Sequence, residues 1–359
     1  MTLQPKNGSR LLLVLASLLV AFFLLMTAEI GLRMAGFRFD TRPRYMEFNF
    51  PNPKELHEIF VPDSTTFWKL KPGEEMGEDI EPINSKGFRG PEFAIEKTPG
   101  VTRVVALGDS VTFGGAVSYP QMLAECLGNG YEVINAGVPG YSLFQGLRMF
   151  ESRIARVKPD IVTVMFGWND HWYARGYPDS RQQVMGAPEL PWPVSFVRGL
   201  CIFQLLHYAV ARGDAKRNES ASHVYRVPMD EYRALLGELI NKVKASNARA
   251  VLLTTPSALD SGKVPDYLFG LGFIRRLENE VEEETARRLR RLHGDYNDIV
   301  REAASKKTVP LLDLESKFYK LSTEKLFRDP SLDVVHPNED GYRLIGDYLC
   351  DTIKFIQPR

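Results

Sequence analysis

The sequence has few cysteines, and their spacing matches no cysteine motif. Three occur among 359 residues, and so odd and sparse a number excludes a fold held together by a disulfide framework. Cys126, Cys201 and Cys350 share no CxxC or Cys/His spacing, which also excludes a zinc finger. We interpret all three as small buried apolar residues.

An excess of either charge is also absent. The 45 Lys and Arg residues equal the Asp and Glu residues in number, whereas a nucleic-acid binder needs a concentrated basic excess to neutralise phosphates. Hydrophobic residues make up 44% of the chain and charged residues 25%, the proportions of a folded globular protein. The sequence has no HExxH motif, P-loop or dinucleotide fingerprint, so we expect no metal, no organic cofactor and no nucleic-acid partner.

Only one long apolar run occurs, near the N-terminus. Residues 11–28 carry no charge, and as a helix they would extend about 27 Å, close to the hydrocarbon thickness of a bilayer. We predict an uncleaved transmembrane signal-anchor helix there, with residues 1–10 in the cytoplasm. A cleaved signal peptide is the alternative, because Lys6 and Arg10 form a basic n-region. The run is long for such a peptide, and Met26-Thr27-Ala28 is a poor cleavage site.

Charges flanking this run give opposing signals about its orientation. Lys6 and Arg10 favour a cytoplasmic N-terminus, but several arginines follow the run, namely Arg33, Arg38, Arg42 and Arg44. A large domain is translocated largely regardless of such charges. We therefore expect a single-pass membrane protein whose main domain is periplasmic or extracellular.

Beyond the anchor, the chain alternates strands and helices. Residues 37–100 are rich in Pro and Phe without a sustained period, which predicts an irregular stalk or cap on the main domain, 101–359. Short apolar runs predict five strands, at 103–107, 132–134, 160–166, 250–254 and 309–314. Helical patterns lie between and after them, at 119–127, 143–156, 229–245, 281–305 and 339–356. This alternation indicates a parallel sheet with right-handed crossovers. Residues 171–227 break the rhythm, and we predict an insertion over the carboxyl edge of the sheet.

Polar motifs follow the first three predicted strands. Ser110 ends Gly108-Asp109-Ser110, Gly137 follows the second strand, and Asn169 lies in Gly167-Trp168-Asn169-Asp170. Each motif alone is an ordinary turn or helix cap. Ligands of parallel sheets, however, bind at the carboxyl ends of the strands, so we expect these residues to lie close together.

Among the six histidines, one has an acid at a spacing suited to catalysis. Asp333 lies three residues before His336, so its carboxylate can reach Nδ1 and leave Nε2 free as a base. A serine hydroxyl needs such a base before it acts as a nucleophile. His171 directly follows Asp170, and we interpret it as a residue that supports the site from behind or lies at the surface.

The combination of these residues predicts acyl transfer through a serine. Ser110 is the expected nucleophile, His336 its base, and Asp333 the group that orients His336. The backbone N–H groups of Ser110 and Gly137 and the side-chain amide of Asn169 are expected to form the oxyanion hole. If the motifs were unrelated, it would be improbable to find all of these residues in this order, with the first three at successive strand ends.

The motifs resemble the four blocks of the SGNH hydrolases, also called the GDSL esterase/lipase family. Gly108-Asp109-Ser110-Val111 is similar to the first block, with Val in place of the usual Leu. Gly137, Gly167-Trp168-Asn169-Asp170 and Asp333-Val334-Val335-His336 resemble the second, third and last. The resemblance covers about residues 101–355. It implies a three-layer α/β/α flavodoxin-like fold, to which the apolar runs add a five-stranded parallel sheet and the N-terminal transmembrane helix.

Residues upstream of the main domain add to the resemblance. Asn84-Ser85-Lys86-Gly87-Phe88-Arg89-Gly90 and the anchor are similar to those of membrane-anchored bacterial members. The resemblance implies a serine esterase acting through an acyl-serine on an O-acyl ester of a small molecule, glycan or lipid. An O-acyltransferase to a surface or secreted glycan and a catalytically silent glycan-binding protein are the alternatives. Aromatic residues that could stack on sugars, but for which we favour core or lid packing, are Trp168, Trp172 and Trp192.

Overall fold

The computed structural model describes residues 7–39, 58–175, 177–182, 192–217, 223–321 and 323–356. The chain divides into two compact units. The smaller unit comprises Met1–Pro43, Pro51–His57 and Ala187–Ser220, and the larger unit comprises Arg44–Phe50, Glu58–Gly186 and Ala221–Arg359.

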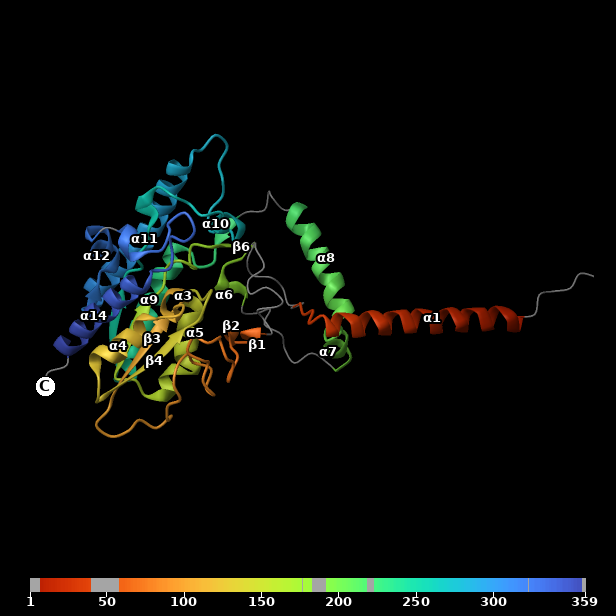
Figure 1. Cartoon of the computed structure of the whole chain (residues 1–359), viewed down its shortest axis with the longest axis horizontal. Coiled ribbons are helices and arrows are strands. Elements are labelled where there is room, and N and C mark those ends of the chain that lie inside the picture. The colour runs from red at the N-terminus through yellow and green to blue at the C-terminus, as the bar shows by residue number, and fades with distance from the viewer. Residues whose placement is uncertain are drawn as a thin grey trace, which may run out of the picture. The chain divides into compact units, whose positions relative to one another are not determined.

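The core of the larger unit is a five-stranded parallel sheet in the order β4-β3-β5-β8-β9, and Figure 1 shows β3 and β4 side by side. The strands are β3 (Thr102–Gly108), β4 (Tyr131–Gly137), β5 (Ile161–Met165), β8 (Arg249–Leu253) and β9 (Leu311–Leu312). All five predicted strands are therefore confirmed. Their apolar runs are continuous because helices cover both faces, and every residue of β5 is buried.

Two sets of helices form the outer layers. α4 (Tyr119–Leu127) packs on α14 (Glu339–Ile356), whereas α9 (Met229–Ala245) packs on both α5 (Leu143–Ser152) and α11 (Glu282–Lys307). Right-handed crossovers on either side of β3 place these sets on opposite faces. The strand order with these layers confirms the three-layer flavodoxin-like fold.

Local signals explain the helix boundaries. Ser118 caps α4 by accepting a hydrogen bond from the Gln121 N–H, and Gly128, at a φ of 66°, ends the helix. The predicted helix over 143–156 is divided, because α5 ends at Ser152 and a 3₁₀ turn follows at Ile154–Val157. The remaining short helices of this unit are α3 (Ser110–Phe113), α6 (Asp179–Gln182), α10 (Asp266–Gly270), α12 (Leu314–Lys320) and α13 (Thr323–Leu326), with a 3₁₀ turn at Leu259–Ser261.

Two predictions about the cysteines differ in outcome. Cys201 is free and buried, as predicted. Cys126 and Cys350 form a disulfide across 224 residues of sequence, so the prediction that they are unpaired apolar residues is wrong. The pairing arises because Cys126 lies on α4 and Cys350 on α14, and these two helices pack together.

Residues 58–100 pack on the sheet domain through short strands and buried side chains. β1 (Phe60–Asp63) and β2 (Phe67–Leu70) form an antiparallel pair. Arg89 reaches the domain with Nη1, which donates to the Phe113 carbonyl at 2.7 Å. The part of the predicted stalk or cap at 40–57 lies outside the described residues.

The segment predicted as one insertion, 171–227, is divided between the two units. Its ends belong to the larger unit, where β6 (Tyr173–Arg175) pairs antiparallel with β7 (His223–Tyr225). Residues 187–220 belong to the smaller unit. Of the three tryptophans considered for sugar stacking, Trp168 and Trp172 are buried in the core, whereas Trp192 is exposed.

Among the described residues, the smaller unit contains α1 (Asn7–Met34), α7 (Trp192–Arg198) and α8 (Cys201–Arg217). Within the described residues, Leu12–Met34 is the helix long and apolar enough to cross a membrane by itself. A signal sequence would have the same length and composition.

Candidate active site

Ser110 begins a short helix directly after β3. β3 ends at Gly108, and α3 starts two residues later. Asp109 lies between them and caps the helix, because its Oδ1 accepts a hydrogen bond from the Val111 N–H at 2.9 Å. The turn therefore presents Ser110 at the carboxyl edge of the sheet.

The structure joins the three side chains predicted to act in catalysis. His336 Nε2 lies 2.9 Å from Ser110 Oγ, although the two residues are 226 positions apart. His336 Nδ1 lies 2.7 Å from Asp333 Oδ2. The side chains of His336 and Asp333 are 37% and 30% exposed, so solvent and substrate can reach the pair.

Several donors surround the second oxygen of Asp333. Its Oδ1 accepts hydrogen bonds from the N–H groups of Val335, at 2.8 Å, and His336, at 3.1 Å. The Tyr267 hydroxyl donates to the same oxygen at 2.9 Å. Burial acts to raise the pKa of Asp333, but His336 and these N–H groups outweigh it and lower the pKa below its usual value. No sequence signal singled out Tyr267, because it lies on the short helix α10, far from the motifs.

Asn169 connects the nucleophile turn with the loop after β4. Its Nδ2 donates to the Tyr141 carbonyl at 3.0 Å and lies 3.4 Å from Asp109 Oδ2. The side chain is almost completely buried, which fixes its orientation. Burial also raises the pKa of Asp109 to about 6.

Gly137 lies at the expected strand end, but its N–H group is already occupied. It pairs in register with Gly108, and its N–H donates to Asn135 Oδ1 at 2.9 Å. A Cβ at position 137 would lie 2.2 Å from the Phe113 nitrogen. The geometry therefore contradicts Gly137 as an oxyanion donor, and its lack of a side chain serves the close approach of α3 to β4.

Two other backbone N–H groups at this edge are unoccupied. Within the described part of the chain, the N–H groups of Ser110 and Gly140 donate to no protein acceptor. Gly140 has a φ of 80°, which favours glycine. It directly precedes Tyr141, whose carbonyl binds Asn169. Gly140 was not predicted from the sequence as an oxyanion donor, although Val138-Pro139-Gly140 is a recognisable turn signal.

The residues after Asn169 are buried beneath the site. Asp170 Oδ1 accepts from the Leu143 N–H at 2.8 Å, and burial raises the pKa of Asp170 well above its usual value. His171 is completely buried, and its Nε2 lies 3.1 Å from His293 Nδ1. The surface interpretation of His171 is therefore wrong.

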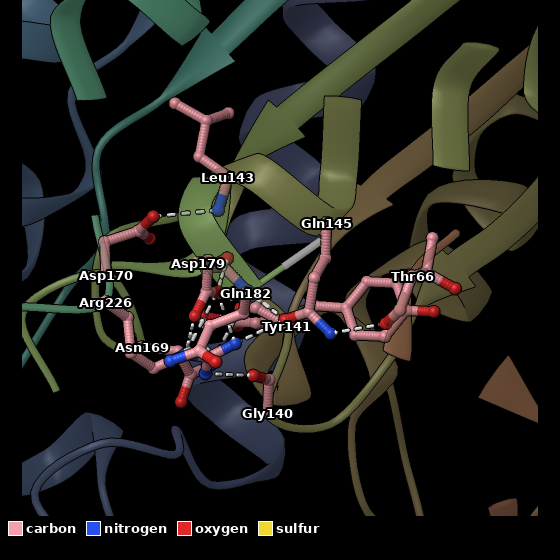
Figure 2. A network of polar contacts seen from close by, with 12 residues as sticks. Thr66, Gly140, Tyr141, Leu143, Gln145, Asn169, Asp170, Asp179, Gln182 and Arg226 are labelled. Atoms are coloured by element: carbon pink, nitrogen blue, oxygen red, sulfur yellow. Dashed lines mark hydrogen bonds and ion pairs between the residues drawn. The ribbon is translucent and has the colours of Figure 1, made fainter. Parts of the chain in front are cut away.

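A buried ion pair supports the loop that contains Gly140 (Figure 2). Arg226 follows β7, and its Nη2 lies 2.9 Å from Oδ2 of Asp179, the first residue of α6. Arg226 Nη1 donates to the Gly140 carbonyl at 2.6 Å, and its Nη2 also donates to Gln145 Oε1. Asp179 accepts from the Ser142 hydroxyl at 2.7 Å. Asp179 and Arg226, from the two ends of the 171–227 segment, thus bind the loop between β4 and α5 at Ser142 and Gly140.

In the residues that the structure describes, no group of three His, Cys, Asp or Glu side chains is arranged to hold a metal ion. The arrangement instead combines a serine hydroxyl, a histidine base held by a carboxylate, and nearby N–H donors. These are the groups that acyl transfer through a serine requires.

Solved structures with similar folds have low sequence identity to this chain. A lipase/acylhydrolase from Enterococcus faecalis is 17% identical, with a TM-score of 0.44, and the match covers 72% of this chain and 99% of that one. A catalytic mutant of an acetylxylan esterase from Geobacillus stearothermophilus is 19% identical, with a TM-score of 0.44, and the match covers 70% and 94%. An alpha/beta hydrolase enzyme from the metagenome of Lake Arreo is 18% identical, with a TM-score of 0.43, and the match covers 72% and 97%.

Sequence comparison gives a more direct assignment. No curated protein matches the chain. The profile of the GDSL-like lipase/acylhydrolase family matches residues 106–344, which is more than half of the 359 residues and includes Ser110, Asn169, Asp333 and His336. The chain therefore belongs to the GDSL-like lipase/acylhydrolase (SGNH) family and is a carboxylic ester hydrolase.

Proposed function

We propose that the chain hydrolyses an O-acyl ester outside the cytoplasm through an acyl-serine intermediate. The main support is the hydrogen-bonded series from Asp333 through His336 to Ser110, with separations of 2.7 and 2.9 Å. His336 Nε2 removes the hydroxyl proton while Ser110 Oγ attacks the ester carbonyl. Asp333, whose lowered pKa keeps it ionised, stabilises the imidazolium that forms.

The charge on the tetrahedral oxygen requires donors placed in advance. We assign this role to the N–H groups of Ser110 and Gly140 and the side-chain amide of Asn169, and thus replace Gly137 by Gly140. The support is that both N–H groups lack an acceptor within the described residues. Asn169 donates one N–H of its amide to the Tyr141 carbonyl at 3.0 Å. Its other N–H makes only a long contact of 3.4 Å with Asp109 Oδ2, which the bond to the oxyanion would replace.

The second half of the reaction restores the enzyme. The C–O bond of the tetrahedral adduct breaks, and His336 Nε2 gives its proton to the departing alcohol. His336 then removes a proton from water, which attacks the acyl carbonyl. The second adduct collapses to release the acid, and the proton returns from His336 to Ser110 Oγ.

We propose that residues 1–10 are cytoplasmic, that 11–28 form an uncleaved anchor, and that the stalk or cap (37–100) and the hydrolase domain (101–359) lie outside. The disulfide between Cys126 and Cys350 supports an exported domain, because such bonds persist in oxidising compartments. Mass spectrometry of the membrane fraction tests the anchor. Recovery of a peptide containing residues 1–10 is expected, whereas a mature chain starting after Ala28 would show a cleaved signal peptide.

The catalytic assignment is tested with p-nitrophenyl acetate and a fluorophosphonate probe. We expect the full chain to hydrolyse the ester and to be labelled on Ser110, as identified by mass spectrometry of the adduct. Ser110→Ala should lower kcat by about 10⁴-fold or more and abolish labelling. Ser246→Ala is the matched control, because Ser246 caps the end of α9, before β8.

An inactive wild-type chain, or a Ser110→Ala variant that keeps its biological role, would favour a glycan-binding protein. Transfer of the acetyl group of p-nitrophenyl acetate to an added glycan, in preference to water, would favour an acyltransferase.

A further inference from the structure

The smaller unit has apolar side chains that the proposed reaction does not use. Trp192 and Phe196 on α7 are 76% and 57% exposed, and their stacked rings have centroids 5.8 Å apart. The first half of α8 adds further exposed apolar residues, Leu205, Leu206 and Val210. Neighbouring exposed apolar side chains of this size indicate a surface that contacts a partner or a membrane.

A buried carboxylate attaches these helices to α1. The Glu29 side chain accepts hydrogen bonds from the N–H groups of Cys201 and Ile202, both at 3.0 Å, at the start of α8. Arg33 Nε also donates to Glu29, at 2.7 Å. Because a carboxylate satisfies N–H groups that a helix start leaves without partners, Glu29 connects α8 to α1. Figure 1 shows α8 beginning beside α1.

The position of Glu29 along α1 sets the depth of this connection. Residues 11–28 carry no charge, and Glu29 is the first charged residue after them. If residues 11–28 cross the hydrocarbon layer, the start of α8 lies at its boundary. A second hydrogen bond joins α8 to the residues that follow α1. The Phe39 N–H donates to Gln204 Oε1 at 2.9 Å.

The apolar parts of the two helices are too short to cross the bilayer, because α8 carries several charges after Val210. Trp192–Arg198 and Cys201–Val210 are bent by 70° relative to one another, and at 1.5 Å per residue they extend about 10 and 15 Å. The hydrocarbon core is about 30 Å thick. Their apolar side chains can therefore reach one leaflet only.

We propose that α7 and the first half of α8 lie in the membrane interface beside α1, with Trp192 and Phe196 inserted between lipid headgroups and acyl chains. This inference rests on the proposed anchor. Tryptophan is enriched at this depth because its ring is apolar and its N–H is polar. Arg33 and Arg198, near the ends of α1 and α7, are placed to meet lipid phosphates.

Quenching of tryptophan fluorescence by brominated lipid tests the proposal on the full chain. Of the four tryptophans, Trp68, Trp168 and Trp172 are buried in the larger unit and Trp192 is exposed. The chain and its Trp192→Phe variant are reconstituted in phosphatidylcholine vesicles, with and without bromine on the acyl chains near the headgroup. The difference between the two spectra isolates the emission of Trp192.

We expect brominated lipid to remove most of the Trp192 emission and aqueous iodide to have little effect on it. Vesicle flotation is measured on the same samples. Equal Trp192 emission with and without bromine, in a chain that floats, overturns the inference and leaves the anchor intact. The inference is also overturned if Trp192 becomes protected from iodide only as the protein concentration rises, because a second copy of the chain then covers the surface. A chain that does not float overturns both proposals.

Discussion

Asn169 carries its side-chain amide between the nucleophile turn and the loop after β4. If this amide holds the oxyanion, Asn169→Ala should lower kcat by about 10²- to 10³-fold with little change in KM, because the bond forms mainly in the transition state. Steady-state kinetics with p-nitrophenyl acetate measures this. Asn241→Ala on the exposed side of α9 is the control. An increase in KM at constant kcat would instead show that Asn169 only binds the substrate.

The buried pair His171 and His293 predicts a pH-dependent stability. His293 Nε2 lies 2.9 Å from the Thr255 carbonyl, so it carries the proton and leaves Nδ1 to accept from His171 Nε2. Both side chains are therefore neutral, and burial lowers the pKa of each. The unfolded chain takes up a proton near pH 6.5, whereas the folded chain does not. The free energy of unfolding should therefore fall as the pH drops below this value, by about 1.4 kcal/mol per pH unit per histidine.

This dependence is measured by urea unfolding between pH 7.5 and 5.5, with each variant compared with the wild type. Asp109 titrates with the opposite sign, since its pKa is raised to about 6, so only differences in slope are informative. His171→Phe should reduce the slope relative to the wild type. An unchanged slope in His171→Phe contradicts the assignment of His171 as a buried neutral group.

At the scale of elements, β7 and α6 support the loop between β4 and α5. Arg226 and Asp179 are 1% and 0% exposed. Arg226→Met should cost about 3–5 kcal/mol of folding stability, because it leaves the Asp179 carboxylate buried without its cation. Thermal unfolding with and without the substitution measures this.

A double variant separates support of the loop from stability alone. Arg226→Met/Asp179→Leu removes both charges and should recover most of the lost stability. It should still have a lower kcat than the wild type, because the Gly140 carbonyl loses its donor and the adjacent N–H groups are no longer held in place. Full recovery of kcat in the double variant would mean that the ion pair only stabilises the fold.

The sequence predicts elements better than it predicts contacts between them. The apolar run that became β3 and the caps of α4 are local signals, and the structure follows them closely. The assignment of Gly137 failed because the strand end was correct but Asn135, two residues earlier, competes for the N–H. Nothing local indicates that Arg226 and Asp179 meet, since their contact depends on how β6 and β7 fold back.

For the whole molecule, the disulfide between α4 and α14 is the main feature that the sequence did not predict. Cys126→Ser/Cys350→Ser should lower the free energy of unfolding by about 2–5 kcal/mol, because the unfolded chain loses a constraint across a long loop. Unfolding with and without a reductant measures this. The reductant should destabilise the wild type and Cys201→Ser alike and leave the double variant unchanged. Equal stability of the oxidised and reduced wild type contradicts the expectation.

The same cross-link determines what a single proteolytic cut does to the enzyme. Ser110 precedes Cys126, and His336 lies between Cys126 and Cys350. Cleavage of one peptide bond between Cys126 and His336 divides the polypeptide into a piece with the nucleophile and a piece with its base. The sulfur bridge keeps the two pieces covalently joined, so nicked enzyme migrates as one species on a gel until a thiol is added.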